Sequence, residues 1–299
     1  MRLAAIVVAV VVGTGAVAVV AAFPGPTVAY LTHWKGSPNR TTAYEPPSPA
    51  DPPVLRLAVA GDIGDSGGRL DRTAAGVTAL AGDRGYDVLL LLGDNVYPEG
   101  DPARLGETVF GPFGTLLAGG TELLAILGNH DVKDGHGSAQ MAALDMPGRW
   151  WARSLGDVLL VGLDSNDPDD PEQLAFLEQS LSGSEARWKI VALHHSPYSA
   201  GYQGSSEDSR RVFSPLFERF GVQLVLSGHD HDYQRSKVIR GVTYVVTGAG
   251  AGTRRTGEHW FTAESFSWHH FVELDIWPDR LVGQAVNQKE RVADRWVLR

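Results

Sequence analysis

The sequence predicts an α/β domain in which two mixed sheets pack together and helices cover their outer faces, a four-layer α/β/β/α sandwich. Between residues 54 and 226, short apolar runs typical of buried strands alternate with amphipathic helical patterns. After residue 238 the pattern changes to strands alone. The chain has 299 residues, 43% of them apolar and 20% charged, which suffices for a packed core.

The individual elements follow from the spacing of apolar residues and from turn and capping residues. Strands are expected at residues 55–60, 88–92, 123–127, 150–153, 158–163, 189–193, 222–226, 238–239, 243–247, 271–276, 280–286 and 292–298. Helices are expected at residues 69–81, at 102–118 with glycine interruptions, at 171–183 and at 214–221. Asp170 can cap the third helix, Pro171 suits its first position, and Gln173 stands at the capping-box position.

The N-terminal stretch, residues 3–23, is almost wholly apolar and long enough to cross a bilayer as a helix. Arg2 precedes it and the next charge is Lys35, so the charge bias places everything after residue 23 outside. A cleaved signal peptide, with small-residue sites after Ala18 or Ala22, is one interpretation. An uncleaved signal anchor is the other, and the length of the stretch favours it slightly. Both predict export, with the folded domain membrane-anchored outside or secreted.

The sequence therefore divides into an export segment at 1–23, a linker at 24–53 and a folded domain at 54–299. Prolines throughout residues 24–53 disfavour regular structure there. The formal net charge of −9 argues against general nucleic-acid binding, and an anionic substrate would need a local positive centre such as bound metal ions. The chain has no cysteine, which excludes disulfides, thiolate zinc sites and cysteine nucleophiles.

The segment Gly93-Asp94-Asn95-Val96-Tyr97 organises the rest of the domain, because it directly follows the strand at 88–92. Loops at the carboxyl ends of strands are where open α/β sheets carry their chemistry. Four similar segments also follow apolar strands and offer oxygen or nitrogen ligands. They are GDIG at 61–64, GNHD at 128–131, VALH at 191–194 and GHDH at 228–231.

These five segments together supply carboxylate, amide and imidazole groups, the ligands that a hard dinuclear metal site uses. A lone Gly-Asp or Gly-His pair is usually a turn. Five such segments in order, each after a strand, are difficult to explain as turns. The set therefore predicts a two-metal phosphoesterase.

The motif order GDIG, GDNVY, GNHD, VALH and GHDH resembles the metallophosphoesterase, or calcineurin-like, superfamily. Within it, the chain is similar to the purple acid phosphatases, especially their small tartrate-resistant type. The resemblance covers residues 55–252 and includes the loop at 138–140. It implies the four-layer sandwich of that superfamily and hydrolysis of phosphomonoesters by a metal-bound hydroxide.

One position indicates the purple acid phosphatase subfamily. Most metallophosphoesterases carry a histidine two residues after the first aspartate, where this chain has Gly64. In the purple phosphatases a tyrosine fills the gap, and Tyr97 stands at that position, three residues after Asp94. A phenolate is a hard anionic ligand that favours Fe(III). The alternative for Tyr97 is an aromatic side chain that merely packs beside the site.

The resemblance also implies a role for each ligand. Metal one would be held by Asp62, Asp94, Tyr97 and His231, and metal two by Asp94, Asn129, His194 and His229, with Asp94 as the bridge. Fe(III) is implied at the Tyr97 site, and Fe(II), zinc or manganese at the second. A trivalent and a divalent ion against three anionic ligands leave about two positive charges, which would attract phosphate and lower the pKa of bound water.

The resemblance places His130 where it hydrogen-bonds the phosphate and helps to protonate the leaving oxygen. The alternative is a structural histidine that orients Asp131. Asn129 and His195 are further expected substrate contacts. Neighbouring strand residues point to opposite sides, so only one of His194 and His195 is expected to be a ligand. The resemblance favours His194, and whether His195 approaches the substrate or packs stays open.

Several other polar residues near the motifs have no assigned role. Asp65, Asp131 and Asp230 are ambiguous, and His269 and His270 are more often ordinary residues than ligands. The segment 248–252, Gly-Ala-Gly-Ala-Gly, could cradle a phosphate, but a tight turn beside the metal site is the favoured interpretation.

The favoured function is that of an acid phosphatase acting on a small phosphorylated substrate, with a mildly acidic optimum implied by the resemblance. A phosphodiesterase or nucleotide phosphohydrolase of the same fold is the alternative, which the loops at 98–120, 132–150, 199–212 and 253–270 would decide. A metal-free binding module is disfavoured because every ligand position is filled. The chain is expected to be a monomer that meets the membrane only through an uncleaved N-terminal segment.

Overall fold

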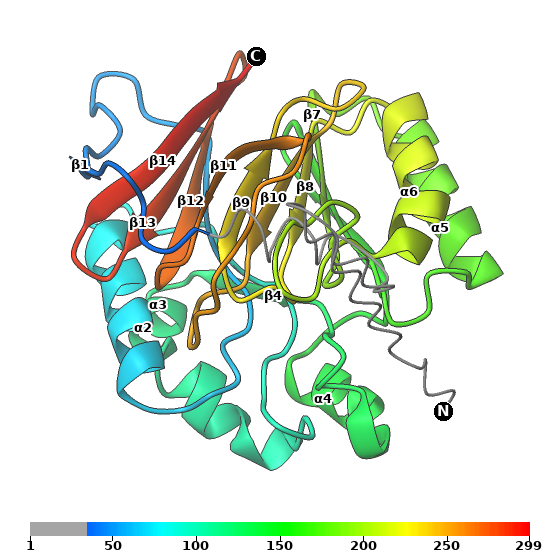
Figure 1. The fold of residues 1–299 in the computed structure, drawn as a ribbon, viewed down its shortest axis with the longest axis horizontal. Helices are drawn as coiled ribbons and strands as arrows, with labels where there is room; N and C mark the ends of the chain where they lie inside the picture. The colour runs from blue at the N-terminus through cyan, green and yellow to red at the C-terminus, as the bar shows by residue number, and fades with distance from the viewer. Residues whose placement is uncertain (1–34) are drawn as a thin grey trace, which may run out of the picture.

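The structure is a computed structural model that describes residues 35–299 (Figure 1). The predicted export segment at 1–23 and the first part of the predicted linker lie outside the described residues. Within residues 35–299, no helix is long and apolar enough to cross a membrane.

Two mixed seven-stranded sheets form the body of the domain, as predicted. The first contains, in spatial order, β1 (Thr42–Ala43), β14 (Arg291–Leu298), β13 (Leu281–Asn287), β12 (His270–Ile276), β2 (Leu55–Ala60), β3 (Val88–Leu91) and β4 (Glu122–Ala125). The second contains β11 (Thr262–Phe266), β9 (Tyr233–Ser236), β10 (Thr243–Thr247), β8 (Leu224–Ser227), β7 (Trp188–Ala192), β6 (Val158–Gly162) and β5 (Trp151–Leu155). Strands β2, β3 and β4 are parallel, as are β6, β7, β8 and β10.

Helices cover the outer face of each sheet, with α2 and α3 on one side of the molecule and α5 and α6 on the other (Figure 1). The helices are α2 (Gly68–Ala81), α3 (Gly114–Ala118), α4 (Gly137–Ala143), α5 (Pro171–Ser182) and α6 (Glu207–Arg219). Short turns of 3₁₀ helix lie at Pro102–Arg104 and Lys133–Gly135, and a π-helical turn lies at Gly106–Phe110.

Alternation along the strands builds three apolar layers. Leu57 and Val59 of β2 point into the core between the two sheets, where they belong to one cluster with Ile190 of β7. Ala58 and Ala60, the intervening residues, belong to the cluster under α2. A third cluster joins the far side of the second sheet to α5 and α6. The predicted α/β/β/α sandwich is confirmed.

The predicted start of the fourth helix at Ser214-Pro215 is wrong. Helix α6 begins seven residues earlier, at Glu207, where the Ser206 hydroxyl accepts a hydrogen bond from the Ser209 N–H. Pro215 lies inside the helix on its exposed side. Because Phe213 and Phe217 are buried on the opposite side, packing outweighs the hydrogen bond that the proline cannot donate.

Smaller differences from the prediction concern short strands and one cap. Strands β9 and β11 were not predicted, and residues 238–239 form only a single bridge, between Ile239 and Val242. Asp170 caps α5 as expected, but the Gln173 side chain contacts the backbone of Asp164 and Asp167 instead of closing a capping box.

Part of the predicted linker packs on the domain. Thr42 and Ala43 pair with the edge strand β14, and the Tyr44 hydroxyl donates to the buried carboxylate of Glu273. Lys35 pairs with the backbone of Thr256 and forms an ion pair with Glu258. The chain therefore contacts the domain well before residue 54, although its prolines exclude longer regular elements.

His270 lies in the core, at the start of β12. Its Nε2 lies 3.0 Å from the Thr247 hydroxyl and its Nδ1 lies 2.7 Å from the Trp268 carbonyl oxygen. Burial lowers the pKa of His270 to about 4. The unfolded chain therefore takes up a proton on His270 at a higher pH than the folded chain does. The unfolding free energy is unaffected above the unfolded-state pKa, and it falls as the pH drops from that value to the folded-state pKa.

We therefore expect His270 to make the domain sensitive to acid between pH 6.5 and pH 4, by at most about 3 kcal/mol of unfolding free energy. Urea unfolding of wild type and His270→Gln at pH 7, 6 and 5 measures this. The variant should be less stable at pH 7 but lose less stability on acidification, whereas the exposed control His259→Gln should follow wild type. Parallel pH profiles for wild type and His270→Gln would contradict the prediction.

Candidate metal centre

The predicted ligands gather at one edge of the sandwich, where parallel strands from both sheets end. Asp62, Asp94 and Asn129 follow β2, β3 and β4 of the first sheet. His194 and His229 follow β7 and β8 of the second sheet. A hydrogen bond joins the end of β2 in the first sheet to the end of β10 in the second: the Gly61 N–H donates to the Thr247 carbonyl at 3.0 Å. The topology thus brings all five predicted segments together.

One group of donors consists of Asp62, Tyr97 and His231. The Tyr97 hydroxyl lies 3.1 Å from Asp62 Oδ1 and 3.0 Å from His231 Nε2. His231 Nε2 lies 3.4 Å from the same Asp62 oxygen. Asp62 is fully buried, and its other oxygen accepts a hydrogen bond from the His229 backbone N–H. Three side chains therefore direct a carboxylate, a phenol and an imidazole at one point.

The second group consists of Asp94, Asn129, His194 and His229. His194 Nε2 lies 3.2 Å from Asn129 Oδ1 and 3.5 Å from Asp94 Oδ1. The rings of His194 and His229 are 5.1 Å apart. Donor atoms of Asp62, Asp94 and His194 all lie within 4.8 Å of one another, so the two groups form one continuous centre.

His194 is oriented by a hydrogen bond that crosses between the sheets. Its Nδ1 lies 2.8 Å from the carbonyl oxygen of Leu92, which can only accept, so Nδ1 donates and Nε2 faces the carboxylates. Metal-binding histidines are commonly fixed in this way. The fully buried ring is thus held with its free nitrogen toward the donors.

The electrostatics of the centre favour a cation. Burial alone would lower the pKa of His194, but the Asp94 carboxylate outweighs burial and raises it to about 10. Burial and the neighbouring His194 lower the pKa of His229 to about 2, so its imidazole stays neutral. Burial raises the pKa of Tyr97 well above its usual range, and Asp62 and Asp94 add to the rise. The nearby carboxylates therefore attract a proton onto His194. A metal ion would compete with that proton for the same histidine nitrogen.

The backbone around the donors is strained and closely packed. Asp62, Asp94 and His229 have φ values of 56°, 53° and 70°, in the left-handed backbone region that residues other than glycine rarely adopt. A Cβ at Gly128 would lie 2.2 Å from Asp94 Oδ1, and one at Gly248 would lie 2.5 Å from Asp62 Oδ2. The contact at Gly248 supports the expectation that small residues are needed beside the metal site.

His130 lies at the rim of the centre, half-buried. Its backbone N–H donates to Asp94 Oδ1 at 2.9 Å, and its Nε2 lies 3.9 Å from Asp94 Oδ2. Its Nδ1 lies 2.6 Å from the Pro98 carbonyl and 2.9 Å from the Lys133 ammonium. The Asp131 carboxylate is held by backbone and amide groups of other residues and not by the His130 ring. The alternative role for His130, orienting Asp131, therefore has no support.

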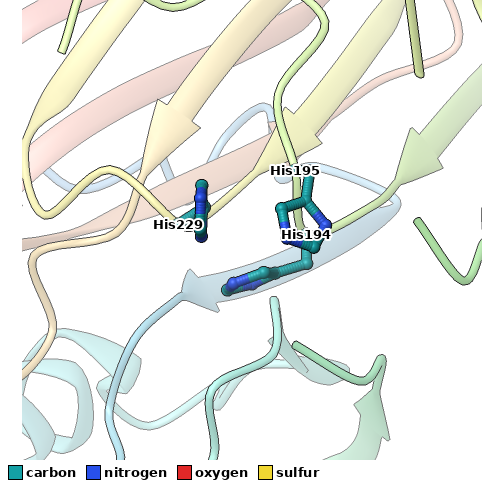
Figure 2. Close-up of side chains that lie close together, drawn as sticks. All are labelled: His194, His195 and His229. Carbon is teal, nitrogen blue, oxygen red and sulfur yellow. The ribbon is translucent and has the colours of Figure 1, made fainter. Parts of the chain in front are cut away.

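His195 differs from expectation. The prediction that His194 and His195 point to opposite sides is wrong, because both follow the end of β7 and lie on a bend instead of on the strand. Figure 2 shows the rings of His194, His195 and His229 grouped together, and their donor nitrogens lie within 4.8 Å of one another. His195 Nδ1 lies 2.9 Å from the Ser165 hydroxyl, and burial together with His194 lowers the pKa of His195 to about 3.

A cleft of about 250 Å³ opens onto the centre. Its lining comprises Asp94, Tyr97, Pro98, Asn129, His130, Gln203, His229, His231 and Arg254. Gln203 and Arg254 were not predicted as site residues. They come from loops at 199–204 and 253–258, which lack a motif, and only the fold brings them to the cleft.

Asp131 and Asp230 are structural. The buried Asp131 carboxylate accepts hydrogen bonds from the backbone N–H groups of Asn95, Val96 and Gly128 and from the side-chain amides of Asn95 and Gln140. It therefore ties the loop that carries Asp94 to the loop that carries Asn129. Asp230 is equally buried and holds the loop at 199–204.

We expect Asp131→Ala to reduce the unfolding free energy by about 3–5 kcal/mol, because it leaves several buried donors without an acceptor. Asp131→Asn keeps the shape of the side chain and part of its hydrogen-bond accepting capacity, so it should reduce the unfolding free energy by less. Urea unfolding of these variants, with the exposed control Asp83→Ala, measures the effect. A loss below about 1 kcal/mol for Asp131→Ala would contradict this role.

Comparison with known proteins places the chain among phosphoesterases. A family model described as calcineurin-like phosphoesterase matches residues 55–233. Tartrate-resistant acid phosphatase type 5 from rabbit (Oryctolagus cuniculus) is 30% identical over 202 residues, covering 56% of this chain and 62% of that protein. The human protein of that name (Homo sapiens) is 29% identical over 247 residues, covering 68% of this chain and 76% of its own length.

Solved structures share the fold. A purple acid phosphatase from yellow lupin (Lupinus luteus) seeds superposes with a TM-score of 0.74 at 17% identity, covering 84% of this chain and 55% of that chain. GAP50, the anchor in the inner membrane complex of Plasmodium, superposes with a TM-score of 0.71 at 20% identity, covering 82% and 88%.

Proposed function

Because the chain belongs to the calcineurin-like phosphoesterase family, we propose that it is a dinuclear metal-dependent acid phosphatase that hydrolyses small phosphomonoesters. The observation that carries the proposal is the single centre formed by two donor groups, joined where oxygens of Asp62 and Asp94 and a nitrogen of His194 lie within 4.8 Å of one another. The similarity to tartrate-resistant acid phosphatases supports the monoester activity.

The donor set fits two hard metal ions. Metal one would be held by Asp62, Asp94, Tyr97 and His231, and metal two by Asp94, Asn129, His194 and His229, so Asp94 would belong to both donor sets. The distances within each group and the orientation of His194 support this assignment. When bound, such ions supply Lewis acidity and an activated water nucleophile.

The proposed metal at Tyr97 is Fe(III), with Fe(II), zinc or manganese at the second position. The Tyr97 hydroxyl is directed at Asp62 and His231. Bound as a phenolate, Tyr97 would be a hard anionic ligand, which favours a trivalent ion. The position of Gly64, where a histidine is usual in the family, supports the same assignment.

The chain's own residues orient the substrate at the rim. His130 would donate a hydrogen bond to the phosphate and pass a proton to the leaving oxygen; its position in the cleft lining, beside Asp94, supports this role. Asn129 offers its amide N–H to the phosphate while its oxygen faces His194. His195 stays neutral over the working pH range and would contact the substrate as an uncharged imidazole.

The organisation of the whole chain is proposed on sequence grounds. Residues 1–23 would export the domain, either as a signal anchor or as a cleaved signal peptide, with a linker before the catalytic domain. The enzyme would act outside the cell as a monomer and meet the membrane only through an uncleaved segment.

Activity assays with p-nitrophenyl phosphate and bis(p-nitrophenyl) phosphate test the proposed function. The full chain, supplied with iron and zinc or manganese, should prefer the monoester and work best at mildly acidic pH. Asp94→Asn serves as the inactive control, because it alters the bridging ligand. A preference for the diester would favour the phosphodiesterase alternative, and a chain that takes up no metal and hydrolyses neither ester would favour the metal-free binding module.

His130→Ala should lower kcat by about 10²-fold, because it removes a proton donor and a phosphate contact. Its metal content should stay at the wild-type level, because the proposed ligands are untouched. Elemental analysis and steady-state kinetics on the same sample measure both effects, with His136→Ala as a control on the neighbouring turn. Unchanged kcat would contradict the assigned role of His130.

A further inference from the structure

One cation lines the cleft and a second contacts a cleft-lining residue, in a protein whose formal net charge is −9. Arg254 lines the cleft directly, together with Gln203. Lys133, on the turn after β4, places its ammonium 2.9 Å from His130 Nδ1 and 3.3 Å from the Pro98 carbonyl. An acidic protein that keeps positive charge at this entrance favours anionic ligands there.

Arg254 is fixed in position by its neighbours. Its backbone N–H donates to the His231 carbonyl at 2.7 Å, which ties it to the proposed metal centre. Its guanidinium lies 5.0 Å above the ring of Tyr202. Stacking on an aromatic face holds a guanidinium while leaving its N–H donors available at the edge.

The loop that carries Tyr202 is held by Asp230, the residue between His229 and His231. The buried Asp230 carboxylate accepts hydrogen bonds from the Ser199 hydroxyl and from the backbone N–H groups of Gln203 and Gly204. The Gly257 N–H then donates to the Ala200 carbonyl at 3.0 Å and joins this loop to the one that carries Arg254. The GHDH motif therefore supports the cleft mouth as well as the metal centre.

Several arginines near the surface pair with carboxylates, whereas Arg254 pairs with an aromatic ring. Arg149, for example, lies near the carboxylates of Asp164, Asp167 and Asp170. Within residues 35–299, the structure pairs the Arg254 guanidinium with the Tyr202 ring and with no carboxylate. A positioned guanidinium without a carboxylate partner is suited to bind an anionic group of a ligand.

We infer that Arg254 is a specificity-determining residue that binds a second anionic group, a carboxylate or phosphate, on the leaving group of the substrate. The inference rests on the proposed function, because the reacting phosphate would occupy the donor end of the cleft near Asn129 and His130. The leaving group then lies in the remaining volume, which Arg254 and Gln203 border. The cleft volume of about 250 Å³ accommodates a small leaving group beside the phosphate.

Two matched esters test the inference: 4-carboxyphenyl phosphate and its neutral amide, 4-carbamoylphenyl phosphate. Wild type should show the higher kcat/KM for the carboxylate. Arg254→Gln should lower kcat/KM for the carboxylate about tenfold more than for the amide, the scale of a charge-assisted hydrogen bond. Arg254→Lys should retain part of the preference, because it keeps the charge but not the fork of donors.

Arg255→Gln is the matched control, since Arg255 is the next residue but does not line the cleft. The preference for the carboxylate should survive in it. Equal losses on both esters in Arg254→Gln would overturn the inference, because they would indicate general attraction of phosphate. A loss of preference in Arg255→Gln as large as in Arg254→Gln would overturn it as well.

A binding measurement separates this inference from the proposed catalysis. Calorimetry compares 4-phosphonobenzoate with phenylphosphonate, neither of which can be hydrolysed. Tighter binding of 4-phosphonobenzoate that is lost in Arg254→Gln supports the inference, even if wild type hydrolysed neither ester and the proposed function failed. Equal affinity of wild type for the two phosphonates would overturn the inference, even if both esters were hydrolysed.

Discussion

The centre depends on the hydrogen bond between His194 Nδ1 and the Leu92 carbonyl, at 2.8 Å, because it joins the two sheets where their parallel strands end. Leu92 follows β3 of the first sheet, and His194 follows β7 of the second. The bond from the Gly61 N–H to the Thr247 carbonyl makes a second link across the same edge. Since each sheet supplies only part of the donor set, the sandwich must close correctly before any complete site exists.

The protein assembles the centre at a cost in stability. Three donor residues have left-handed backbone conformations, and carboxylates and imidazoles are packed together away from water. Glycines at 128 and 248 permit this packing, because a side chain at either position would collide with a carboxylate. Such strain and crowding are typical of sites whose ligand offsets them, and two cations would relieve the repulsion among the acidic donors.

Most of the proposed metal ligands could be predicted from the sequence, because they follow the ends of strands. Asp62, Asp94 and His194 could be placed because each follows an apolar run at the end of a predicted strand. The start of α6 could not be predicted from Pro215, because the buried faces of Phe213 and Phe217 outweigh the local preference of proline. The orientation of His195 depends on a bend beyond β7, and the position of Arg254 depends on contacts between loops; neither leaves a local pattern.

The central claim, that the centre holds two metal ions with a tyrosinate on one of them, is tested most directly by a visible absorption spectrum with metal analysis of the same purified sample. We expect two metals per chain and a purple or pink band that disappears in Tyr97→Phe. A colourless protein with two divalent ions would contradict the iron assignment while leaving the dinuclear site. A chain that stays metal-free after iron, zinc and manganese are offered would contradict the claim as a whole.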